Sequence, residues 1–297
     1  MSKKPTISVI TPSYLQSEFI EQNLRSLLLQ QYPRLEHVVV DGGSTDGTVE
    51  ILKRYERRYQ LHWISERDFG QSDALMKGFR ISRGDLIGWL NSDDMYFERG
   101  TLSFVAEVFR AHPEVDVLYG DQVAVDEKSQ IFRVGRLFNW NLPMVLRGCS
   151  ISQPATFLRR EVVMENEIER NLHHAMDLEY WIRLGKRYQF MHVNRILAAF
   201  RIHGGAKSTA FRQVARKEAR RVLTENGQDF GLKYWTLHCF KDLPAAGIRR
   251  ILGLYDCFQI PLHRDELAFD PGDVSAWKLV FGQIWPLRTP PYFWIRR

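Results

Sequence analysis

The sequence predicts an α/β fold with a mostly parallel central sheet, helices on both faces and a helical C-terminal extension. Strand-like apolar runs alternate with helical segments over the first 120 residues, which is typical of parallel strands joined by crossover helices. The composition, 44% hydrophobic and 26% charged, is that of a globular protein. Beyond Gly120 this alternation gives way to a different pattern.

Apolar runs and helical spacing define each expected element. After Gly120, two short runs separated by a polar turn predict a hairpin, at 121–125 and 131–134. The other expected strands are 7–11, 37–40, 61–65, 86–90, 117–119 and 190–200, and the expected helices are 18–30, 51–59, 75–82, 101–112 and 177–187.

Charge and cysteine content narrow the class of protein. A net charge of +6 favours an anionic partner such as a nucleotide, a nucleic acid or an acidic membrane surface. Cys149, Cys239 and Cys257 form no paired motif, which disfavours a disulfide scaffold or zinc site and favours a reducing cytosol. With neither a secretion signal nor an apolar run of about 20 residues, we expect a cytoplasmic protein without a transmembrane helix.

The C-terminal extension, 206–297, mixes basic and aromatic residues. A helix at 208–225 carries Arg and Lys over much of its circumference, and 277–297 interleaves aromatic and basic side chains. This composition suits peripheral contact with anionic lipids at a membrane interface. Packing of the aromatic residues on the main domain is an equally good interpretation.

Two adjacent carboxylates, Asp93 and Asp94, follow the strand 86–90. Like charges this close repel unless a positive group lies between them, and a divalent cation with a bound diphosphate would suit the pair. In open α/β sheets ligands bind beyond the carboxyl ends of the strands, where this pair falls. The alternative is that both residues merely form a turn.

The glycine-rich loop 42–47 matches neither common nucleotide motif. It lacks the GxGxxG spacing and follows the second strand instead of the first. Thr48 stands where a P-loop requires lysine. The sequence therefore supports neither a dinucleotide-dependent dehydrogenase nor a P-loop kinase.

Four polar loops are expected at one end of the sheet, at 11–14, 41–44, 66–74 and 91–94. In these loops the chain resembles the family 2 inverting glycosyltransferases of GT-A fold, of bacterial-polysaccharide type. The resemblance covers about 5–208, and the segments 153–157, 176–181 and 200–203 also look like this family. It implies a nucleotide-sugar-binding part at 1–120 and an acceptor-side part at 121–205.

The resemblance implies a donor site around the first three loops. Asp41 would hydrogen-bond the base, usually uracil, since a carboxylate accepts an imide N–H. Thr11 and Pro12 would line the same site, and Asp73 would lie near the sugar and ribose. Many relatives carry a basic residue at position 71, so Gln71 leaves open which side chain contacts phosphate. The candidates are Arg67, Gln71 and Lys77.

The resemblance also implies a metal site. Asp94 would ligate Mg²⁺ or Mn²⁺, and Asp93 would reach the ribose or the water shell of the metal. Oxygen ligands suit these ions. Asn91 replaces the leading acid of the fuller motif. His203 matches a histidine that approaches the metal or diphosphate in several relatives, although a structural role is equally open.

For catalysis, Asp177 matches the general base of the family, with Glu179 as the reserve candidate. Asp177 could also cap the helix that follows it. Gln153 and Trp181 would shape the acceptor site, and Trp181 could equally belong to the core.

Taken together, these residues predict a metal-dependent inverting glycosyltransferase with a nucleotide diphosphate sugar donor, UDP-linked. The acceptor would be a glycan, a lipid-linked molecule or a protein. Two alternatives remain open: a non-catalytic protein that binds nucleotide sugars or glycans, and a sugar nucleotidyltransferase. Nucleic acid is not expected as a partner, because the basic residues surround no recognised motif.

Overall fold

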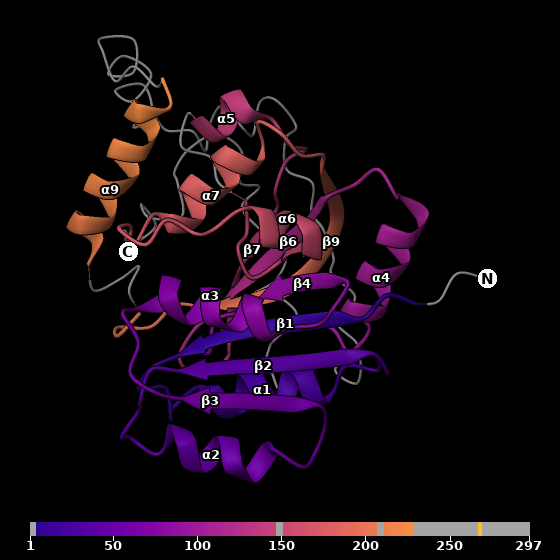
Figure 1. Ribbon diagram of the computed structural model, residues 1–297, viewed down its shortest axis with the longest axis vertical. Helices are drawn as coiled ribbons and strands as arrows, with labels where there is room; N and C mark the ends of the chain where they lie inside the picture. The colour runs from indigo at the N-terminus through magenta and orange to yellow at the C-terminus, as the bar shows by residue number, and fades with distance from the viewer. Residues whose placement is uncertain (1–3, 147–150, 207–210, 228–266, 269–297) are drawn as a thin grey trace.

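The computed structural model describes residues 4–146, 151–206, 211–227 and 267–268, and Figure 1 labels its elements. The strands in these ranges are β1 (Ile7–Ser13), β2 (Leu35–Asp41), β3 (Leu61–Ser65), β4 (Leu86–Trp89), β5 (Met95–Tyr96), β6 (Val117–Val125), β7 (Ile131–Gly135), β8 (Thr156–Arg159) and β9 (Phe190–Arg201). The helices are α1 (Ile20–Leu28), α2 (Thr48–Tyr55), α3 (Gln71–Ile81), α4 (Thr101–Ala111), α5 (Leu142–Leu146), α6 (Arg160–Glu165), α7 (Met176–Leu184) and α9 (Arg212–Glu225).

The strands form one sheet in the order β3-β2-β1-β4-β8-β6-β9-β5, with β7 paired to β6. The first four strands of this order are parallel, as the alternation predicts. Beyond β4 the sheet is mixed, because β8 runs antiparallel to both of its neighbours. The sheet is thus parallel from β3 to β4 and mixed beyond, where β6 and β9 also pair in parallel.

Strand β6 continues through Gly120, where the sequence suggested two separate strands. Its pairing with β9 shifts register around Asp121, so one long strand contains an irregularity instead of a break. The hairpin expected after Gly120 is confirmed, since β7 pairs antiparallel with the second half of β6.

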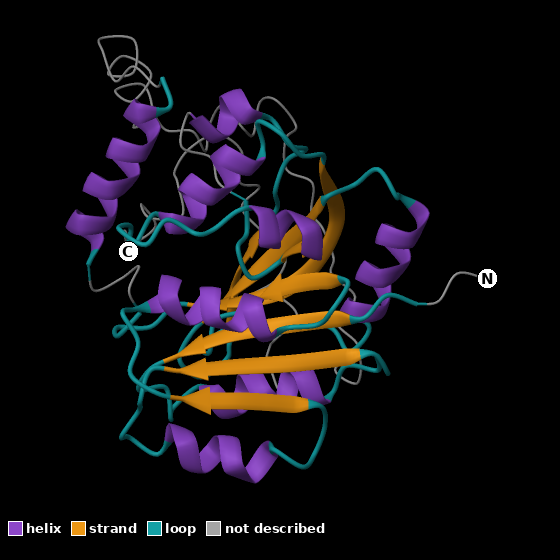
Figure 2. Cartoon of the chain, in the orientation of Figure 1, coloured by secondary structure: helices purple, strands orange, loops and turns teal. Residues whose placement is uncertain are grey.

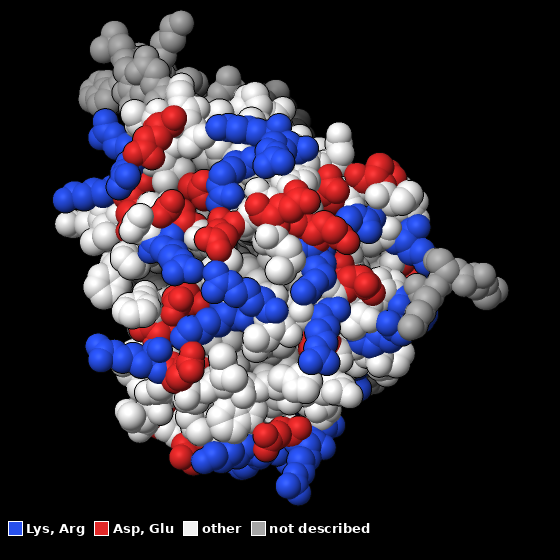
Figure 3. All heavy atoms as spheres, viewed as in Figure 1, with Lys and Arg blue, Asp and Glu red and all other residues white. Residues whose placement is uncertain are grey.

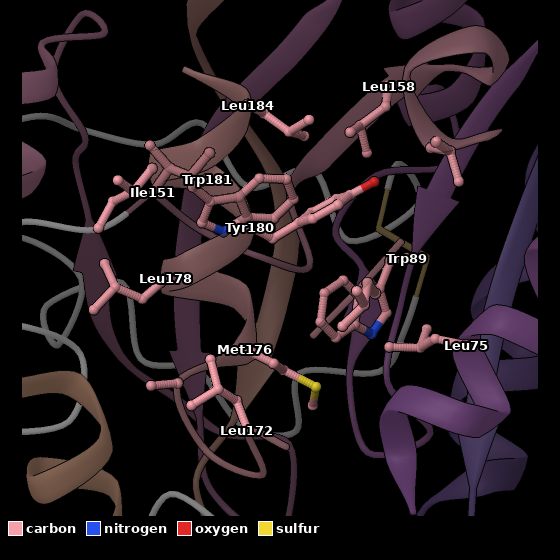
Figure 4. Close-up of a cluster of buried hydrophobic side chains, with 14 of the residues drawn as sticks. Leu75, Trp89, Ile151, Leu158, Leu172, Met176, Leu178, Tyr180, Trp181 and Leu184 are labelled. Carbon is pink, nitrogen blue, oxygen red and sulfur yellow. The ribbon is translucent and has the colours of Figure 1, made fainter. Parts of the chain in front are cut away.

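Helices cover both faces of the sheet, as Figure 2 shows. Side chains alternate between the two faces along each strand. Val38 and Val40 pack in the cluster that contains α3 and α7, whereas Val39 packs with α1 and α2 on the opposite face. Figure 4 shows the first cluster, in which Leu75 of α3 lies on the side opposite Trp181 of α7.

Helix α9 packs on the main domain. Ala215, Ala219, Val222 and Leu223 are buried in the same cluster as α7. None of the helices in the described part of the chain is long and apolar enough to cross a membrane. The aromatic and basic segment 277–297, for which the sequence suggests lipid contact, lies outside the described residues.

Candidate active site at the carboxyl edge of the sheet

The strands β1, β2 and β3 end level with one another. Ser13 pairs with Asp41, and Asp41 pairs with Ser65, in the parallel ladders. In Figure 1 the arrowheads of these strands point to the same side of the molecule. The loops after the strands therefore meet at one edge, as expected from the sequence.

Asp41 is fully buried at this edge. Both of its carboxylate oxygens accept hydrogen bonds from neighbouring residues. Oδ2 accepts hydrogen bonds from Gly43 N at 3.1 Å, Ser44 N at 2.8 Å and Ser65 Oγ at 2.6 Å. Oδ1 accepts from Ser44 Oγ at 2.5 Å. In this arrangement the carboxylate holds the loop after β2 against the end of β3.

Thr11 faces the interior and not the loop region that the sequence suggested it would line. Its Oγ1 lies 2.9 Å from His37 Nε2, and His37 Nδ1 lies 2.7 Å from Tyr59 Oη. Burial lowers the pKa of His37 from 6.5 to about 3, so the imidazole is neutral at physiological pH. Pro12, level with Val40 in the parallel ladder, is also buried.

Two cations at the third loop and the helix after it, Arg67 and Lys77, differ in how accessible they are to a donor phosphate. Lys77 Nζ lies 2.7 Å from Glu66 Oε1 and 3.5 Å from Asp73 Oδ2. The hydrogen bond with Glu66 raises the pKa of Lys77. Arg67 is exposed, so its guanidinium is more accessible to a phosphate than the lysine is.

Three side-chain amides meet at the end of β4. Asn91 Oδ1 accepts from Gln71 Nε2 at 2.8 Å and from Trp89 Nε1 at 2.9 Å. Asn91 Nδ2 donates to Gln153 Oε1 at 2.9 Å, and Gln153 Nε2 donates to the carbonyl of Trp89. An amide both donates and accepts, whereas an ionised carboxylate only accepts. The network therefore needs asparagine at position 91, where the fuller motif has an acid, because Asn91 both accepts and donates. The same network ties α3 to the segment before β8.

Asp93 and His203 form a pair next to this network. His203 Nε2 lies 3.1 Å from Asp93 Oδ2. The side chain of His203 is 8% exposed and that of Asp93 is 20% exposed. The ring of Phe19 packs against His203 with a centroid distance of 4.4 Å. A carboxylate and an imidazole at this separation can bind one divalent cation together.

Asp94 lies behind this pair and is fully buried. Its Oδ1 accepts from Arg201 N at 2.9 Å, whereas its buried Oδ2 has no hydrogen-bond partner. Burial, and next the charge of Asp93, raise the pKa of Asp94 well above its usual range. A nearby cation would relieve both effects.

Arg201 is a buried residue of the site that the sequence analysis did not single out. Its guanidinium donates to the carbonyls of Asp93 at 3.0 Å, Asp126 at 2.7 Å and Glu127 at 3.1 Å. Because these acceptors come from two loops, Arg201 fixes the carboxylate segment relative to the turn after β6. It lies two residues before His203, so one strand end orients both members of the pair.

Asp177 lies in the first turn of α7, where Asp177 Oδ1 accepts from Leu178 N at 2.8 Å. Ser72 Oγ contacts Met176 Sδ at 3.1 Å, which places the beginnings of α3 and α7 side by side. Glu179, the reserve candidate, is held by two hydrogen bonds from Arg183, at 2.7 and 2.9 Å. Glu179 is thus held in an ion pair on its own helix.

A carboxylate of α9 holds the segment that leads into α7. Glu218 Oε2 accepts from the backbone N–H groups of His173 at 3.1 Å, His174 at 2.6 Å and Ala175 at 3.1 Å. The N-cap residue of α7, Ala175, makes no side-chain cap of its own. The basic helix therefore supports the turn that carries Asp177, a role that its composition did not reveal.

Trp181 lies in the core and not at an acceptor surface. Its side chain is fully buried, and its ring lies 6.5 Å from that of Trp89 and 5.5 Å from that of Tyr180. Figure 4 shows it between Ile151 and Tyr180. The core interpretation, left open by the sequence, is the one that its burial supports. Gln153 is 8% exposed and belongs to the amide network.

Within the described ranges, no cluster of three or more His, Cys, Asp or Glu side chains could hold a metal ion. The fit to a divalent cation therefore depends on the pair of Asp93 and His203. On the face shown in Figure 3, basic and acidic side chains are interspersed.

Comparison with solved structures supports the GT-A fold. A structure of S. aureus TarS in complex with UDP-GlcNAc matches with a TM-score of 0.57 and 20% identity, covering 84% of this chain and 80% of that chain. The mannosyltransferase PcManGT from Pyrobaculum calidifontis, in complex with GDP-Man and Mn²⁺, matches with a TM-score of 0.58 and 18% identity, covering 86% and 82%. Both likenesses bear on the fold alone.

Sequence relatives and a family match identify the chain. It is 25% identical over 239 residues to chondroitin synthase of Escherichia coli, covering 78% of this chain and 34% of that protein. It is 38% identical over 96 residues to TuaG, a putative teichuronic acid biosynthesis glycosyltransferase of Bacillus subtilis, covering 31% and 38%. The chain thus spans only about a third of the length of these two relatives. The family described as glycosyl transferase family 2 matches residues 8–174, which is more than half of the chain. The chain therefore belongs to glycosyl transferase family 2.

Proposed function

We propose that the chain is a metal-dependent inverting glycosyltransferase that moves a sugar from a UDP-linked donor to a glycan, lipid-linked or protein acceptor. The observation that carries this proposal is the pair of Asp93 and His203, 3.1 Å apart, at the edge where four loops meet. The printed names of relatives, a chondroitin synthase and a putative teichuronic acid enzyme, support a glycan as product. The two solved structures hold UDP-GlcNAc and GDP-Man.

Asp93 and His203 would hold Mg²⁺ or Mn²⁺. The bound cation would stabilise the negative charge of the departing diphosphate. In metal enzymes this lowers the free energy of the transition state by roughly several kcal/mol. Asp94 lies behind the pair with one oxygen unpaired, and a bound cation would favour its ionised form. Arg201 keeps this segment in place through the carbonyl of Asp93. Arg67, exposed on the third loop, is the cation best able to meet the donor phosphates.

Asp177 would act as the general base. Its carboxylate takes the proton of the acceptor hydroxyl while that oxygen attacks the anomeric carbon of the donor. The bond from this carbon to the diphosphate oxygen breaks on the opposite side, so the configuration inverts. No covalent intermediate with the protein is needed. General-base assistance typically contributes roughly 10² to 10⁴ in rate.

The test is thermal unfolding of the full chain with UDP, GDP, dTDP, CDP and ADP, each with and without Mn²⁺. A ligand at about 100 times its Kd adds roughly 2.7 kcal/mol to stability. We expect UDP to raise the midpoint when Mn²⁺ is present. Asp93→Asn and His203→Gln should each lose the part of the shift that depends on Mn²⁺.

Glu107→Gln is the matched control, because Glu107 is an exposed carboxylate on α4. This variant should keep the full shift with UDP and Mn²⁺. The proposed function fails if none of the nucleotides stabilises the wild-type chain. The metal assignment fails if Asp93→Asn responds to Mn²⁺ as the wild type does. Release of UDP with formation of a glycosylated product would then separate a transferase from a binding protein, and formation of a nucleotide sugar would indicate a nucleotidyltransferase.

A further inference from the structure

A cavity with a volume of about 590 Å³ lies between the turn after α7, the start of β9 and the segment that contains Asn139 and Trp140. This volume is in the range of small-molecule sites. β9 is parallel to β6, and β6 and β4 are both antiparallel to β8, so β9 starts at the edge opposite the carboxyl ends of β1 to β4. His192 lines the cavity, whereas His203 follows the end of the same strand, roughly 35 Å farther along the chain at about 3.3 Å per residue. The cavity is therefore separate from the candidate active site.

Asp121 of β6, which is fully buried, fixes two walls of this cavity. Its Oδ2 accepts from Arg136 Nη1 at 2.6 Å, and its Oδ1 accepts from Leu137 N at 2.8 Å. Oδ1 also lies 3.0 Å from His192 Nε2. One carboxylate thus holds both the segment that leads to Trp140 and the histidine of β9.

His192 offers the cavity a hydrogen-bond acceptor in a fixed orientation. An ionised carboxylate only accepts hydrogen bonds, so Nε2 carries the hydrogen that points to Asp121. In the neutral ring Nδ1 is then an acceptor, and it makes no hydrogen bond with any residue that the structure describes. The side chain is 5% exposed and lines the cavity. A ligand hydroxyl group can therefore donate to a ring that is already oriented.

Trp140 presents a fixed aromatic surface to the same cavity. Its ring stacks on that of Phe190 with a centroid distance of 4.0 Å and an interplanar angle of 25°. A Cβ atom at Gly185, the residue that ends α7, would lie only 1.9 Å from Trp140 Cζ2, so glycine makes room for the ring. Both contacts restrict the rotamer of Trp140 before any ligand binds. A rigid aromatic surface of this kind can pack against the C–H groups of a sugar ring.

Two exposed cations on the turn after α7, Lys186 and Arg187, also line the cavity. Lys186 Nζ donates to the neutral Oδ1 of Asn226 at 2.6 Å, and neither cation forms an ion pair with a carboxylate in the part of the chain that the structure describes. The carboxylates that bond to this turn, Asp116 and Glu165, are not among the lining residues. The positive charge of the turn is therefore available to an anionic ligand.

We propose that this cavity is a second glycan-binding subsite, which takes an acidic sugar residue. The inference rests on the proposed function for the identity of the ligand as a glycan. The sugar ring would pack on Trp140, its carboxylate or phosphate would meet Lys186 and Arg187, and a hydroxyl group would donate to His192 Nδ1. A neutral sugar leaves the two cations without a partner, so the subsite should favour an acidic glycan.

Calorimetric titration of the full chain tests this assignment. The acidic probes are the hexamer of galacturonic acid and hyaluronan hexasaccharide, and the neutral probe is maltohexaose. We expect at least one acidic probe to bind about 10-fold or more tightly than maltohexaose, with an affinity that falls as the salt concentration rises. The joint variant Lys186→Gln and Arg187→Gln should weaken binding of that probe about 10-fold. Gly185→Ala, whose Cβ would displace Trp140, should also weaken it.

Lys53→Gln together with Arg57→Gln is the matched control. Both residues are exposed, on α2 and on the turn after it, and neither lines the cavity. This control removes the same charge and should leave binding of the acidic probe unchanged. Because Lys186 and Arg187 are exposed as well, their joint variant should unfold at nearly the wild-type midpoint, which separates lost binding from lost folding.

The outcomes distinguish this inference from the proposed function. The subsite is overturned if neither acidic probe binds, if the joint variant of Lys186 and Arg187 binds as the wild type does, or if the control weakens binding equally. Equal affinity for inorganic phosphate and for the hexasaccharides would indicate an anion site without a sugar contact and would overturn it too. The shift with UDP and Mn²⁺ tests the transferase independently. Its absence, with acidic probe binding that depends on the turn, would remove the proposed function and leave a glycan-binding cavity.

Discussion

Protonation of His37 is expected to destabilise the fold in acid. The imidazole is 0% exposed, and its nitrogens lie 2.9 Å from Thr11 Oγ1 and 2.7 Å from Tyr59 Oη. A neutral imidazole carries one N–H, and each hydroxyl can donate or accept, so this chain of hydrogen bonds suits the neutral form. Among the residues that the structure describes, no carboxylate contacts the ring to stabilise a charged form.

The sign and size of the effect follow from the pKa of His37. Burial lowers it from 6.5 to about 3 in the folded state, so the unfolded chain takes up the proton first. The contribution to stability is complete above the unfolded value and is lost as the pH falls toward 3. Each pH unit in this window costs about 1.4 kcal/mol, which gives a loss of about 2 kcal/mol by about pH 5. That is a substantial fraction of the stability of an ordinary domain.

Urea unfolding at about pH 7.5, 6 and 5 measures this loss, since the free energy of unfolding follows from the midpoint and slope. The comparison variant is His37→Gln, whose amide can meet both hydroxyls but does not titrate. We expect the wild type to lose about 2 kcal/mol more than this variant between about pH 7.5 and 5.

His62→Gln is the control, because His62 is exposed on β3, and it should retain the steep wild-type dependence on pH. The reasoning would be refuted if His37→Gln lost stability as steeply as the wild type over the same interval. In that case other groups, and not the buried imidazole, would account for the sensitivity to acid.

Substitutions at three positions test the candidate site and its support. Asp177→Asn should lower the transfer rate by roughly 10² to 10⁴ while the midpoint shift with UDP and Mn²⁺ persists; a near wild-type rate would remove Asp177 as the base. Asn91→Asp should destabilise the chain by about 1 to 3 kcal/mol in urea unfolding, because a carboxylate oxygen would replace the amide that donates to Gln153 Oε1 at 2.9 Å; unchanged stability would contradict this network. Glu218→Ala should lower both the unfolding midpoint and kcat, because the backbone N–H groups of the segment that leads into α7 lose their acceptor. Glu218→Gln, which keeps an acceptor oxygen, should restore part of each, and equal effects of the two changes would argue against a role for these hydrogen bonds.

Local sequence determined the first half of the fold. The expected strands and helices from β1 to α4 agree with the observed ones to within a few residues, except for the two-residue β5. Buried parallel strands and amphipathic helices have strong periodic patterns of their own. The carboxyl ends of neighbouring parallel strands lie at the same edge of a sheet. The sequence therefore also predicted that the loops after β1, β2 and β4 meet at one edge. The resemblance to family 2 glycosyltransferases, carried by those loops, is confirmed by the family match.

The arrangement beyond β4 depended on long-range pairing. β8 has four residues and follows a stretch interrupted by Pro143, Gly148 and Pro154, so no periodicity marked it as the strand that joins the two halves of the sheet. β5, with two residues, was missed for the same reason. Short strands are specified by the partners they meet and not by their own pattern.

Tertiary structure also decided which site residues are available. Asp41 has the right chemistry for a base, yet Ser65, which is 24 positions away, helps to occupy it. The supporting contacts of Arg201 with Asp94 and of Glu218 with His174 span 107 and 44 positions, respectively. A sequence shows which residues can donate, accept or carry charge. Which of these groups remain free for a ligand depends on neighbours that only folding brings within hydrogen-bond distance.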